Sequence, residues 1–114
     1  MSRIRIIAGA IVLVAASPAN AAEPNYVGVW ASNRAQCKVA QDRPNAPMAV
    51  RANGYDQHEA HCTFTSVKSV WRTWKIQSAC SIQGDKQNLA HQFKVRGNRL
   101  VMTQGKVVRP LVRC

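Results

Sequence analysis

Two stretches in the second half of the chain alternate between polar residues and residues that are apolar or small. In Thr73–Ile82 every second position from Trp74 onward belongs to the apolar or small set, and Leu89–Arg96 shows the same alternation. A repeat of two is the period of a β-strand that buries one face, because successive side chains point to opposite sides. We find no comparable helical period after residue 21. The pattern therefore predicts an all-β protein.

Turn-forming residue pairs separate the apolar runs of the chain. These pairs are Asn53-Gly54, Gly84-Asp85, Gly97-Asn98 and Gln104-Gly105. Residues of this kind favour tight turns, and several of them tolerate the left-handed backbone that hairpins require. With strands joined in chain order by such turns, we expect one small antiparallel meander or barrel of about seven or eight strands.

The remaining strands are less regular. Tyr26–Ala31 is rich in β-branched and aromatic residues, Met48–Ala52 precedes a turn, and Tyr55–Val67 is long enough for one bent strand or two. Pro110 lies in the last run. Because it lacks an N–H group, it predicts an edge, a bulge or the seam of a barrel at that point.

Counting outward from the turns predicts a register. Two-residue turns at Gly97-Asn98 and Gly84-Asp85 join the last three regular strands. The resulting pairs are Val95 with Leu100, Phe93 with Met102, Cys80 with Leu89, and Ser78 with His91. Most of these pairs join apolar residues, as expected for the buried face of a sheet.

The N-terminal residues are typical of a secretory signal peptide. Arg3 and Arg5 precede the apolar run Ile6–Ala16, and Ala19-Asn20-Ala21 supplies small residues at a cleavage point. Cleavage would leave one domain, residues 22–114, in the periplasm or outside a bacterial cell. The apolar run is shorter than the roughly twenty residues of a spanning helix, so we expect no membrane span in the mature chain.

All four cysteines follow the predicted leader. An even number in a small exported domain predicts two disulfides, because the compartment is oxidising. A hairpin centred near Trp71 places Cys62 opposite Cys80, which favours a Cys62–Cys80 bridge and leaves Cys37–Cys114. Four cysteines allow three connectivities, so the other two stay open at this point.

A short segment between Asp56 and Cys62 holds several potential metal ligands. His58, Glu59 and His61 form a candidate metal site. The spacing of the histidines is not the i, i+4 spacing of a helical zinc motif, and on a strand the two rings point to opposite faces. A solvated hairpin end is the favoured interpretation, and we expect no cofactor.

His91 is a single histidine on the predicted inner face. Nucleophilic catalysis requires a nucleophile, a base and an orienting group within hydrogen-bonding reach. The chain has five acidic residues, and Asp42, Asp56 and Asp85 lie near predicted turns. No triad or carboxylate pair emerges, so we expect a core histidine and a protein that is not an enzyme.

Basic side chains are in large excess, with 16 Lys and Arg against five acidic residues. In the predicted register Lys75 lies opposite Lys94 on the outer face, with Arg96 and Arg99 nearby. Like charges that face each other across strands are destabilising, so such a stripe indicates an anionic partner. The alternative is that these basic side chains are simply hydrated, as in many basic exported proteins. A protein or an anionic component of the cell envelope fits. Nucleic acid fits poorly, because few aromatic residues are free to stack on bases.

Trp71 stands apart from the alternating pattern. It lies in a predicted loop between Val70 and Arg72. A Trp beside an Arg is a frequent composition at protein contacts. The ring could equally fold back as a lid on the barrel, and the sequence leaves both alternatives open.

The start of the domain carries a resemblance to a known family. Gly28-Val29-Trp30 followed by a meander resembles the opening of lipocalin-like barrels. The resemblance implies that the Trp plugs one end of the barrel under a basic residue from a late strand. Arg109 or Arg113 could match that residue.

The short length is more similar to that of the small periplasmic barrels that inhibit secreted metalloproteases. The similar segments are Trp30 with Cys37, Trp74-Lys75-Ile76 with Cys80, and Gly97–Met102. This resemblance implies Cys37–Cys80 as an alternative bridge, and an inhibitory N-terminal segment at Ala22–Tyr26. Cys62 and Cys114 depart from the family's single disulfide. The chain also resembles short exported bacterial proteins with a G-x-W-A start and a terminal R-C.

Taken together, these features predict an exported, non-enzymatic binding protein, either inhibitor-like or an accessory of the envelope. Its expected contact residues are Trp71, Lys75, Lys94, Arg96 and Arg99. The alternatives are a carrier with a small ligand at the barrel mouth and a carrier of metal. The sequence predicts no oligomeric state.

Overall fold

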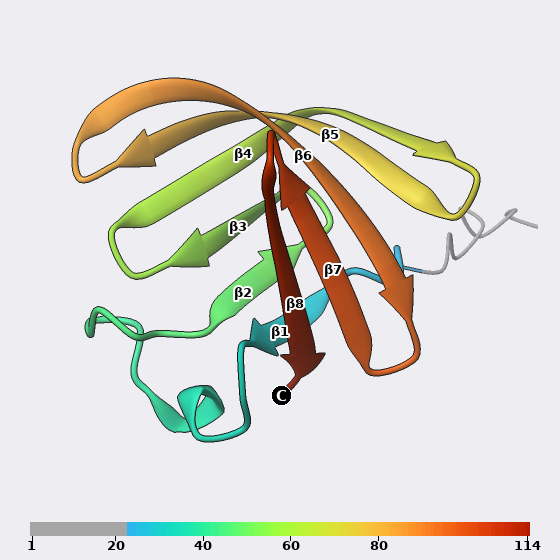
Figure 1. Ribbon diagram of the computed structural model, residues 1–114. Coiled ribbons are helices and arrows are strands. Elements are labelled where there is room, and N and C mark those ends of the chain that lie inside the picture. Colours follow the sequence, from blue (N-terminus) through green and yellow to red (C-terminus); the bar gives the residue numbers. More distant parts are fainter. Residues whose placement is uncertain (1–22) are drawn as a thin grey trace, which may run out of the picture.

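The computed structural model describes residues 23–114, so the predicted signal peptide lies outside the described residues. Eight antiparallel strands follow one another in chain order and close into a barrel (Figure 1). They are β1 (Gly28–Ala31), β2 (Met48–Arg51), β3 (Gly54–Gln57), β4 (Ala60–Val70), β5 (Thr73–Ile82), β6 (Asp85–Arg96), β7 (Arg99–Gln104) and β8 (Val107–Arg113), with one 3-10 turn, η1 (Gln36–Lys38), after β1. The all-β barrel is confirmed. No helix of the described chain is long and apolar enough to span a membrane.

Both favoured disulfides are present. Cys62 is joined to Cys80, and Cys37 is joined to Cys114. The alternative Cys37–Cys80 bridge, which the inhibitor resemblance implied, is therefore wrong for this chain. The physical reason is register, because Cys62 and Cys80 lie directly opposite each other on adjacent strands.

A β-bulge brings these two cysteines together. The β4–β5 turn consists of Trp71 and Arg72, since Val70 pairs with Thr73. Without a bulge, this turn would place Cys62 opposite Ser81. The register shifts between Phe64 and Ser66, and the extra residue realigns Cys62 with Cys80.

The turn at Gly97-Asn98 and the register that it sets are confirmed. Three other turns lie one residue from their predicted positions, at Ala52-Asn53, Gln83-Gly84 and Gly105-Lys106. At Gln83-Gly84 both residues have a positive φ, which matches the twist of the flanking strands. The expected β5–β6 pairs are therefore wrong by two residues. Cys80 pairs with Gln87, Ser78 with Leu89, and Ile76 with His91.

Strand boundaries differ from expectation: β1 begins two residues after Tyr26, β2 ends one residue before Ala52, and two longer stretches differ more. The stretch Tyr55–Val67 forms two strands and not one bent strand. It contains β3 except for Gly54 and most of β4, and a turn at His58-Glu59 joins them. The strand expected at Leu89–Arg96 begins earlier, at Asp85, because polar side chains continue the ladder beyond the barrel core. These outer residues pair with β5 although they bury little surface.

The barrel interior is packed with aromatic side chains. Tyr26, just before β1, lies in edge or tilted contact with Phe64, Trp74 and Phe93. Its hydroxyl donates to the Ala52 carbonyl at 2.6 Å. The buried Tyr26 therefore holds the N-terminal segment against the barrel, and its ring occupies interior space.

The seam between β1 and β8 is short. The two strands pair through Trp30–Arg113 and Ala31–Val112, and Pro110 lies in β8 just before this contact, as its missing N–H predicted. Of the two candidate arginines, Arg113 packs over Trp30, with 4.2 Å from its guanidinium carbon to the ring centroid. Arg113 also donates to the carbonyls of Val27 and Asn25, each at 3.0 Å.

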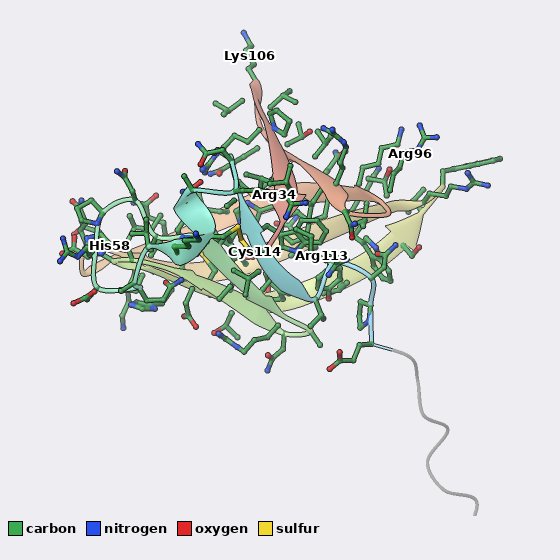
Figure 2. All side chains as sticks on the ribbon, turned by 90° about the horizontal axis from the view of Figure 1, so that it is seen from below. Arg34, His58, Arg96, Lys106, Arg113 and Cys114 are labelled. Carbon is green, nitrogen blue, oxygen red and sulfur yellow. A yellow bond between two sulfur atoms is a disulfide. The ribbon has the colours of Figure 1, made fainter. Side chains whose placement is uncertain are left out.

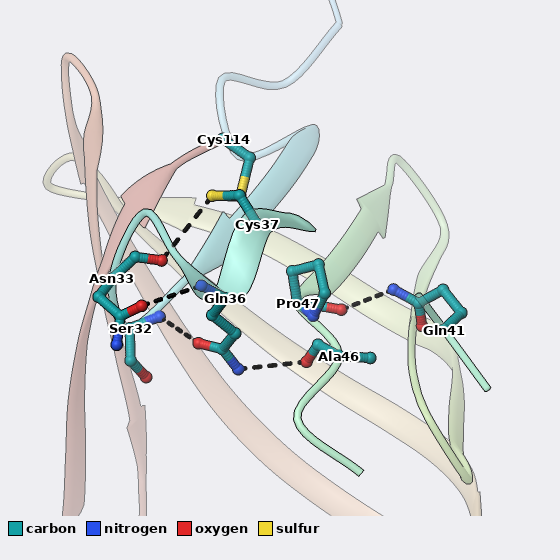
Figure 3. The surroundings of a disulfide bond; sticks show 8 residues. All are labelled: Ser32, Asn33, Gln36, Cys37, Gln41, Ala46, Pro47 and Cys114. Carbon is teal, nitrogen blue, oxygen red and sulfur yellow. Dashed lines mark hydrogen bonds between the residues drawn. A yellow bond between two sulfur atoms is a disulfide. The ribbon is translucent and has the colours of Figure 1, made fainter. Parts of the chain in front are cut away.

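Side chains around the Cys37–Cys114 bridge anchor the long β1–β2 loop (Figure 3). The Gln36 side chain accepts from the Ser32 amide at 2.6 Å and donates to the Ala46 carbonyl at 3.3 Å. Gln41 donates to the Pro47 carbonyl at 2.7 Å. These bonds hold the loop to itself and to the start of β2, so the bridge ties an ordered loop to the C-terminus.

Candidate functional site

The hairpin turns lie alternately at two ends of the barrel. We call one end the basic end; it carries the turns at Ala52-Asn53, Trp71-Arg72 and Gly97-Asn98. The other, the loop end, carries the turns at His58-Glu59, Gln83-Gly84 and Gly105-Lys106 and the long β1–β2 loop. In Figure 2, Arg96 of the basic end and His58 of the loop end lie on opposite sides of the molecule.

Charges are distributed unevenly between these ends. Besides Arg51, which is paired with Asp56, six exposed cations lie at or near the basic end: Lys68, Arg72, Lys75, Lys94, Arg96 and Arg99. Four of the five acidic residues lie toward the loop end: Asp42, Asp56, Glu59 and Asp85. Across residues 23–114, Arg51–Asp56 is the only ion pair that involves a Lys or an Arg. The six cations therefore have no carboxylate within 4 Å, and they give this end a positive potential.

The predicted Lys75–Lys94 pair is wrong. Lys75 lies opposite Lys68 on β4 and Gln92 on β6, whereas Lys94 lies opposite Thr73. The cause is the β5–β6 turn, which lies one residue earlier than expected and so shifts the register by two. All four predicted cations still lie on the outer face, because a shift of two residues preserves the side on which each side chain lies.

Like charges do meet across strands, but in different pairs. Lys68 pairs with Lys75, and Arg96 pairs with Arg99 beside the Gly97-Asn98 turn. Directly opposed like charges are destabilising. Lys68 and Arg72 were not among the predicted contact residues. Arg72 could have been included because it adjoins Trp71, whereas Lys68 lies opposite Lys75 because the turn consists of the two residues Trp71 and Arg72 and is not centred on Trp71 alone.

Trp71 is not a lid. Its side chain is 93% exposed at the tip of the β4–β5 hairpin. It lines an open surface hollow of about 510 Å³ together with Arg72, Lys94, Val95, Arg96 and Gly97. The structure thus brings Trp71 together with two of the four predicted cations, Lys94 and Arg96. Lys75 lies farther back along the strands, and Arg99 lies across the next hairpin.

The backbone at this tip is unusual. Trp71 and Arg72 have φ values of 50° and 61°, in the left-handed region that glycine and asparagine occupy more easily. Two successive residues of this kind at one hairpin turn cost roughly 1–3 kcal/mol each. Outliers of this kind are enriched at functional sites, so the turn supports a role for the two side chains that it displays.

The candidate metal ligands lie at the loop end. His58, in the turn rather than on a strand, lines a surface hollow of about 500 Å³ with Glu59 and His61. Nδ1 of His61 is 2.8 Å from an Asp56 carboxylate oxygen. Within residues 23–114, three metal-ligating side chains bring their ligand atoms within 4.8 Å of one another at Cys62, Cys80 and His91 and nowhere else. The predicted set is therefore not gathered as a metal site.

Asp56 organises the charged groups near these histidines. Burial raises the pKa of its carboxyl, but hydrogen bonds from His61 and Arg51 lower it by more, so the net pKa is below its ordinary value. Asp56 is thus an anion that binds Arg51 and His61 at once. This arrangement stabilises the β2–β4 part of the sheet and leaves no free carboxylate pair there.

His91 lies in the core beside the Cys62–Cys80 disulfide. Its ring contacts Tyr55 at 5.6 Å and stacks on Phe93 at 6.3 Å between centroids. Burial lowers the pKa of the ring, which favours the neutral form. Neither ring nitrogen has a hydrogen-bond partner among the described protein atoms, and the same holds for the hydroxyl of Ser78.

This buried group does not form a metal site in its present state. Metal ions bind the cysteine thiolate, and both sulfur atoms are bonded to each other instead. The structure confirms the inner-face position of His91, but the hydrogen-bond partner usual for a core histidine is missing. The basic end is therefore the strongest candidate for function.

Comparisons with protein-family models, with curated proteins and with solved structures give no match for this chain. The resemblance to lipocalin-like barrels and metalloprotease inhibitors stays a prediction.

Proposed function

We propose that this protein is an exported, non-enzymatic binding protein whose basic end holds a partner with an anionic surface. The observation that carries the proposal is the group of six exposed cations without carboxylate partners, gathered beside the exposed Trp71. The partner is an envelope protein or another anionic component of the envelope.

The loss of sheet stability that these cations cause supports the proposal. The pairs Lys68–Lys75 and Arg96–Arg99 place like charges face to face, and each such pair weakens the sheet by a few tenths of a kcal/mol, up to about 1 kcal/mol. An anionic partner would relieve this repulsion. It would also gain charge-assisted hydrogen bonds, which are about twice as strong as neutral ones.

Export is supported by the disulfides. All four cysteines are paired, and structural disulfides persist in oxidising compartments outside the cytoplasm. The predicted signal peptide is consistent with this location. The packed interior of the barrel also favours a surface site over an interior ligand, because aromatic side chains occupy the core.

The inhibitory mode implied by the family resemblance has less support. It would insert the segment Ala22–Tyr26 into a protease, yet Tyr26 is buried in the barrel. Asn25 accepts from Trp74 Nε1 at 2.8 Å and, through its carbonyl, from Arg113. The described part of this segment is held against the barrel, so we assign the contact to the basic end instead.

A charge-matched pair of variants tests the proposal. One variant replaces Lys75, Lys94, Arg96 and Arg99 with Gln, and the other replaces Arg34, Lys38, Arg43 and Lys106, which are exposed elsewhere. Both variants lose four positive charges. At roughly 0.5–1 kcal/mol per contact, the first should bind immobilised poly-glutamate or heparin at least about 30-fold more weakly. The second should stay within about threefold of the unmodified protein.

Binding is measured as a dissociation constant at several salt concentrations, with far-ultraviolet circular dichroism to verify that each variant folds. A smaller salt dependence in the first variant supports direct contacts. Equal weakening in both variants would show that only net charge matters, and the proposal of a binding end would then be wrong.

A further inference from the structure

The tip of the β4–β5 hairpin presents an almost fully exposed aromatic ring beside a partly exposed apolar side chain. Trp71 is 93% exposed, and Val70 beside it is 40% exposed. By contrast, Trp30 is completely buried, and its Nε1 donates to the Tyr26 carbonyl. Trp74 is half-buried against the core, and its Nε1 donates to Asn25. Among the three tryptophans, Trp71 is thus the one that the fold leaves for a contact outside the molecule.

Cations surround this tip at two depths. Arg72, Lys94 and Arg96 line the hollow with Trp71. Lys68 and Lys75 pair three or four residues back along the hairpin, which at about 3.3 Å per residue places them roughly 10 Å behind the tip. The surface therefore consists of an exposed aromatic side chain at the tip, with positively charged side chains beside and behind it.

This arrangement fits a lipid surface better than a protein partner. Protein hot spots bury an aromatic anchor inside a ring of contacts that exclude water. Here the neighbours of Trp71 in the hollow are mainly cations, and the ring projects outward. At membrane surfaces, Trp rings lie at the level of the headgroups, and Lys and Arg bind the anionic phosphates.

We infer that the basic end docks on an anionic phospholipid bilayer, with Trp71 and Val70 inserted among the headgroups and Arg72, Lys94 and Arg96 bound to phosphates. The inference rests on the proposed function and names the partner of the same surface. It also gives a reason for the left-handed turn. The Trp71-Arg72 turn keeps both side chains at the extreme tip, where an Asn-Gly turn would display neither.

The test uses vesicles of phosphatidylcholine with 30% phosphatidylglycerol, and vesicles of phosphatidylcholine alone as the neutral control. The protein is expressed with its own leader and purified from the cell envelope or the medium. Intact-mass spectrometry then identifies its N-terminus. All variants are prepared alike, so any retained leader contributes equally to each. Cosedimentation measures the partition coefficient, and quenching by brominated lipids, compared between the unmodified protein and Trp71→Asn, reports whether Trp71 enters the bilayer.

We expect binding to the anionic vesicles, little binding to the neutral ones, and a blue shift of the tryptophan fluorescence that is absent in Trp71→Asn. Trp71→Asn should lower the partition coefficient about tenfold and abolish quenching by brominated lipid. The double change Lys94→Gln and Arg96→Gln should lower it about 25-fold, at roughly fivefold per cation near the surface. Asn suits a left-handed turn, so the first variant is expected to fold.

The matched control lies at the other end of the barrel. Lys106→Gln with Val108→Ser removes a cation and an exposed apolar side chain from the β7–β8 hairpin, where Val108 is 60% exposed. This variant should bind vesicles within about twofold of the unmodified protein. Equal losses in the control and in the basic-end variants would overturn the inference.

Two further outcomes separate this inference from the proposed function. If the protein binds poly-glutamate through the basic end but not the anionic vesicles, the lipid partner is wrong and an acidic protein takes its place. If neither probe depends on the basic end, both the inference and the proposed function are wrong. Vesicle binding that is unchanged in Trp71→Asn would contradict insertion of the tip.

Discussion

The wall formed by β4, β5 and β6 and the seam between β1 and β8 differ in how they are held together. In the wall, β5 pairs along its whole length with β4 on one side and with β6 on the other. At the seam, β1 meets β8 through Trp30–Arg113 and Ala31–Val112. Figure 1 shows β4 and β5 curving across the top of the barrel, and β1 beside the lower end of β8.

Side chains compensate for the short seam. Arg113 packs on Trp30 and binds two carbonyls, and the Cys37–Cys114 bridge ties the C-terminus to the β1–β2 loop. The wall has extensive backbone pairing on both sides of β5. Its hairpin tip therefore tolerates a strained turn and cations that have no carboxylate partner. The comparison indicates that side-chain contacts and a disulfide replace backbone pairing at the seam, whereas extensive pairing in the wall tolerates the hairpin tip to which we assign the proposed contact.

The largest expected effect comes from opening the seam. Replacing Cys37 and Cys114 with Ser should lower the free energy of unfolding by about 4–5 kcal/mol, because that bridge closes a loop of 77 residues. Denaturation in urea measures the loss. Amide exchange should accelerate first in β1 and β8, since backbone pairing there is short.

The wall disulfide supplies the control. Replacing Cys62 and Cys80 with Ala opens a loop of 18 residues and should cost about 3 kcal/mol, with a further small loss from the buried sulfur atoms. Amide exchange in β1 and β8 should then rise no faster than in the rest of the barrel. The comparison fails if opening the seam bridge accelerates exchange uniformly.

A smaller change in the free energy of unfolding, this time an increase, is expected from substitutions at the tip of the wall. Trp71→Asn with Arg72→Gly places a favourable hairpin pair in the left-handed turn and should stabilise the fold by about 1–2 kcal/mol. The same urea midpoint measures the gain. The matched change Gln83→Asn should stabilise by at most about 1 kcal/mol, because Gly84 already suits its turn. An equal or larger gain at Gln83 would show that the Trp71 turn carries no special strain.

The smallest expected change in stability arises from His91, in the interior of the wall. Burial lowers the pKa of His91, so at pH values below its ordinary pKa of about 6.5 the unfolded chain binds a proton that the folded chain resists. Stability should therefore fall as the pH drops from about 6.5 toward the lowered folded-state pKa.

His91→Leu removes this titration and an unpartnered polar ring. It should flatten the pH dependence of the melting temperature between pH 7 and 5, and it should stabilise the fold by up to about 1 kcal/mol at pH 7.5. The exposed change Gln92→Leu is the control for added apolar volume. His58 and His61 stay in both variants, so an unchanged pH profile in His91→Leu would contradict the role of burial.

Local patterns predicted much of the barrel. The alternation in Thr73–Ile82 predicted the bounds of β5 and its buried face, and Gly97-Asn98 predicted the β6–β7 register. The opposition of Cys62 and Cys80 was also predictable, although the predicted hairpin centre near Trp71 contained no bulge. The exposed cations were predictable because each lies out of phase with its apolar neighbours.

The neighbours of those cations could not be predicted. Moving the β5–β6 turn by one residue shifts the register by two, which keeps every side chain on its face but changes its partner across the strand. Lys75 therefore stays exposed, yet its partner on β6 is Gln92 instead of Lys94. The choice between Gln83-Gly84 and Gly84-Asp85 depends on how β5 and β6 fit the closed barrel, and turn residues alone do not specify it.

The sequence by itself determined the strands, their buried faces and the excess of positive charge, because these depend on residue type and on a period of two. The tertiary structure decided which charges stand together, how far Trp71 projects, and how the seam is closed. Those properties depend on the turns at Trp71-Arg72 and Gln83-Gly84 and on contacts between segments as distant as Asn25 and Arg113. Barrel closure selects among registers that are locally equivalent, and this selection creates the basic end.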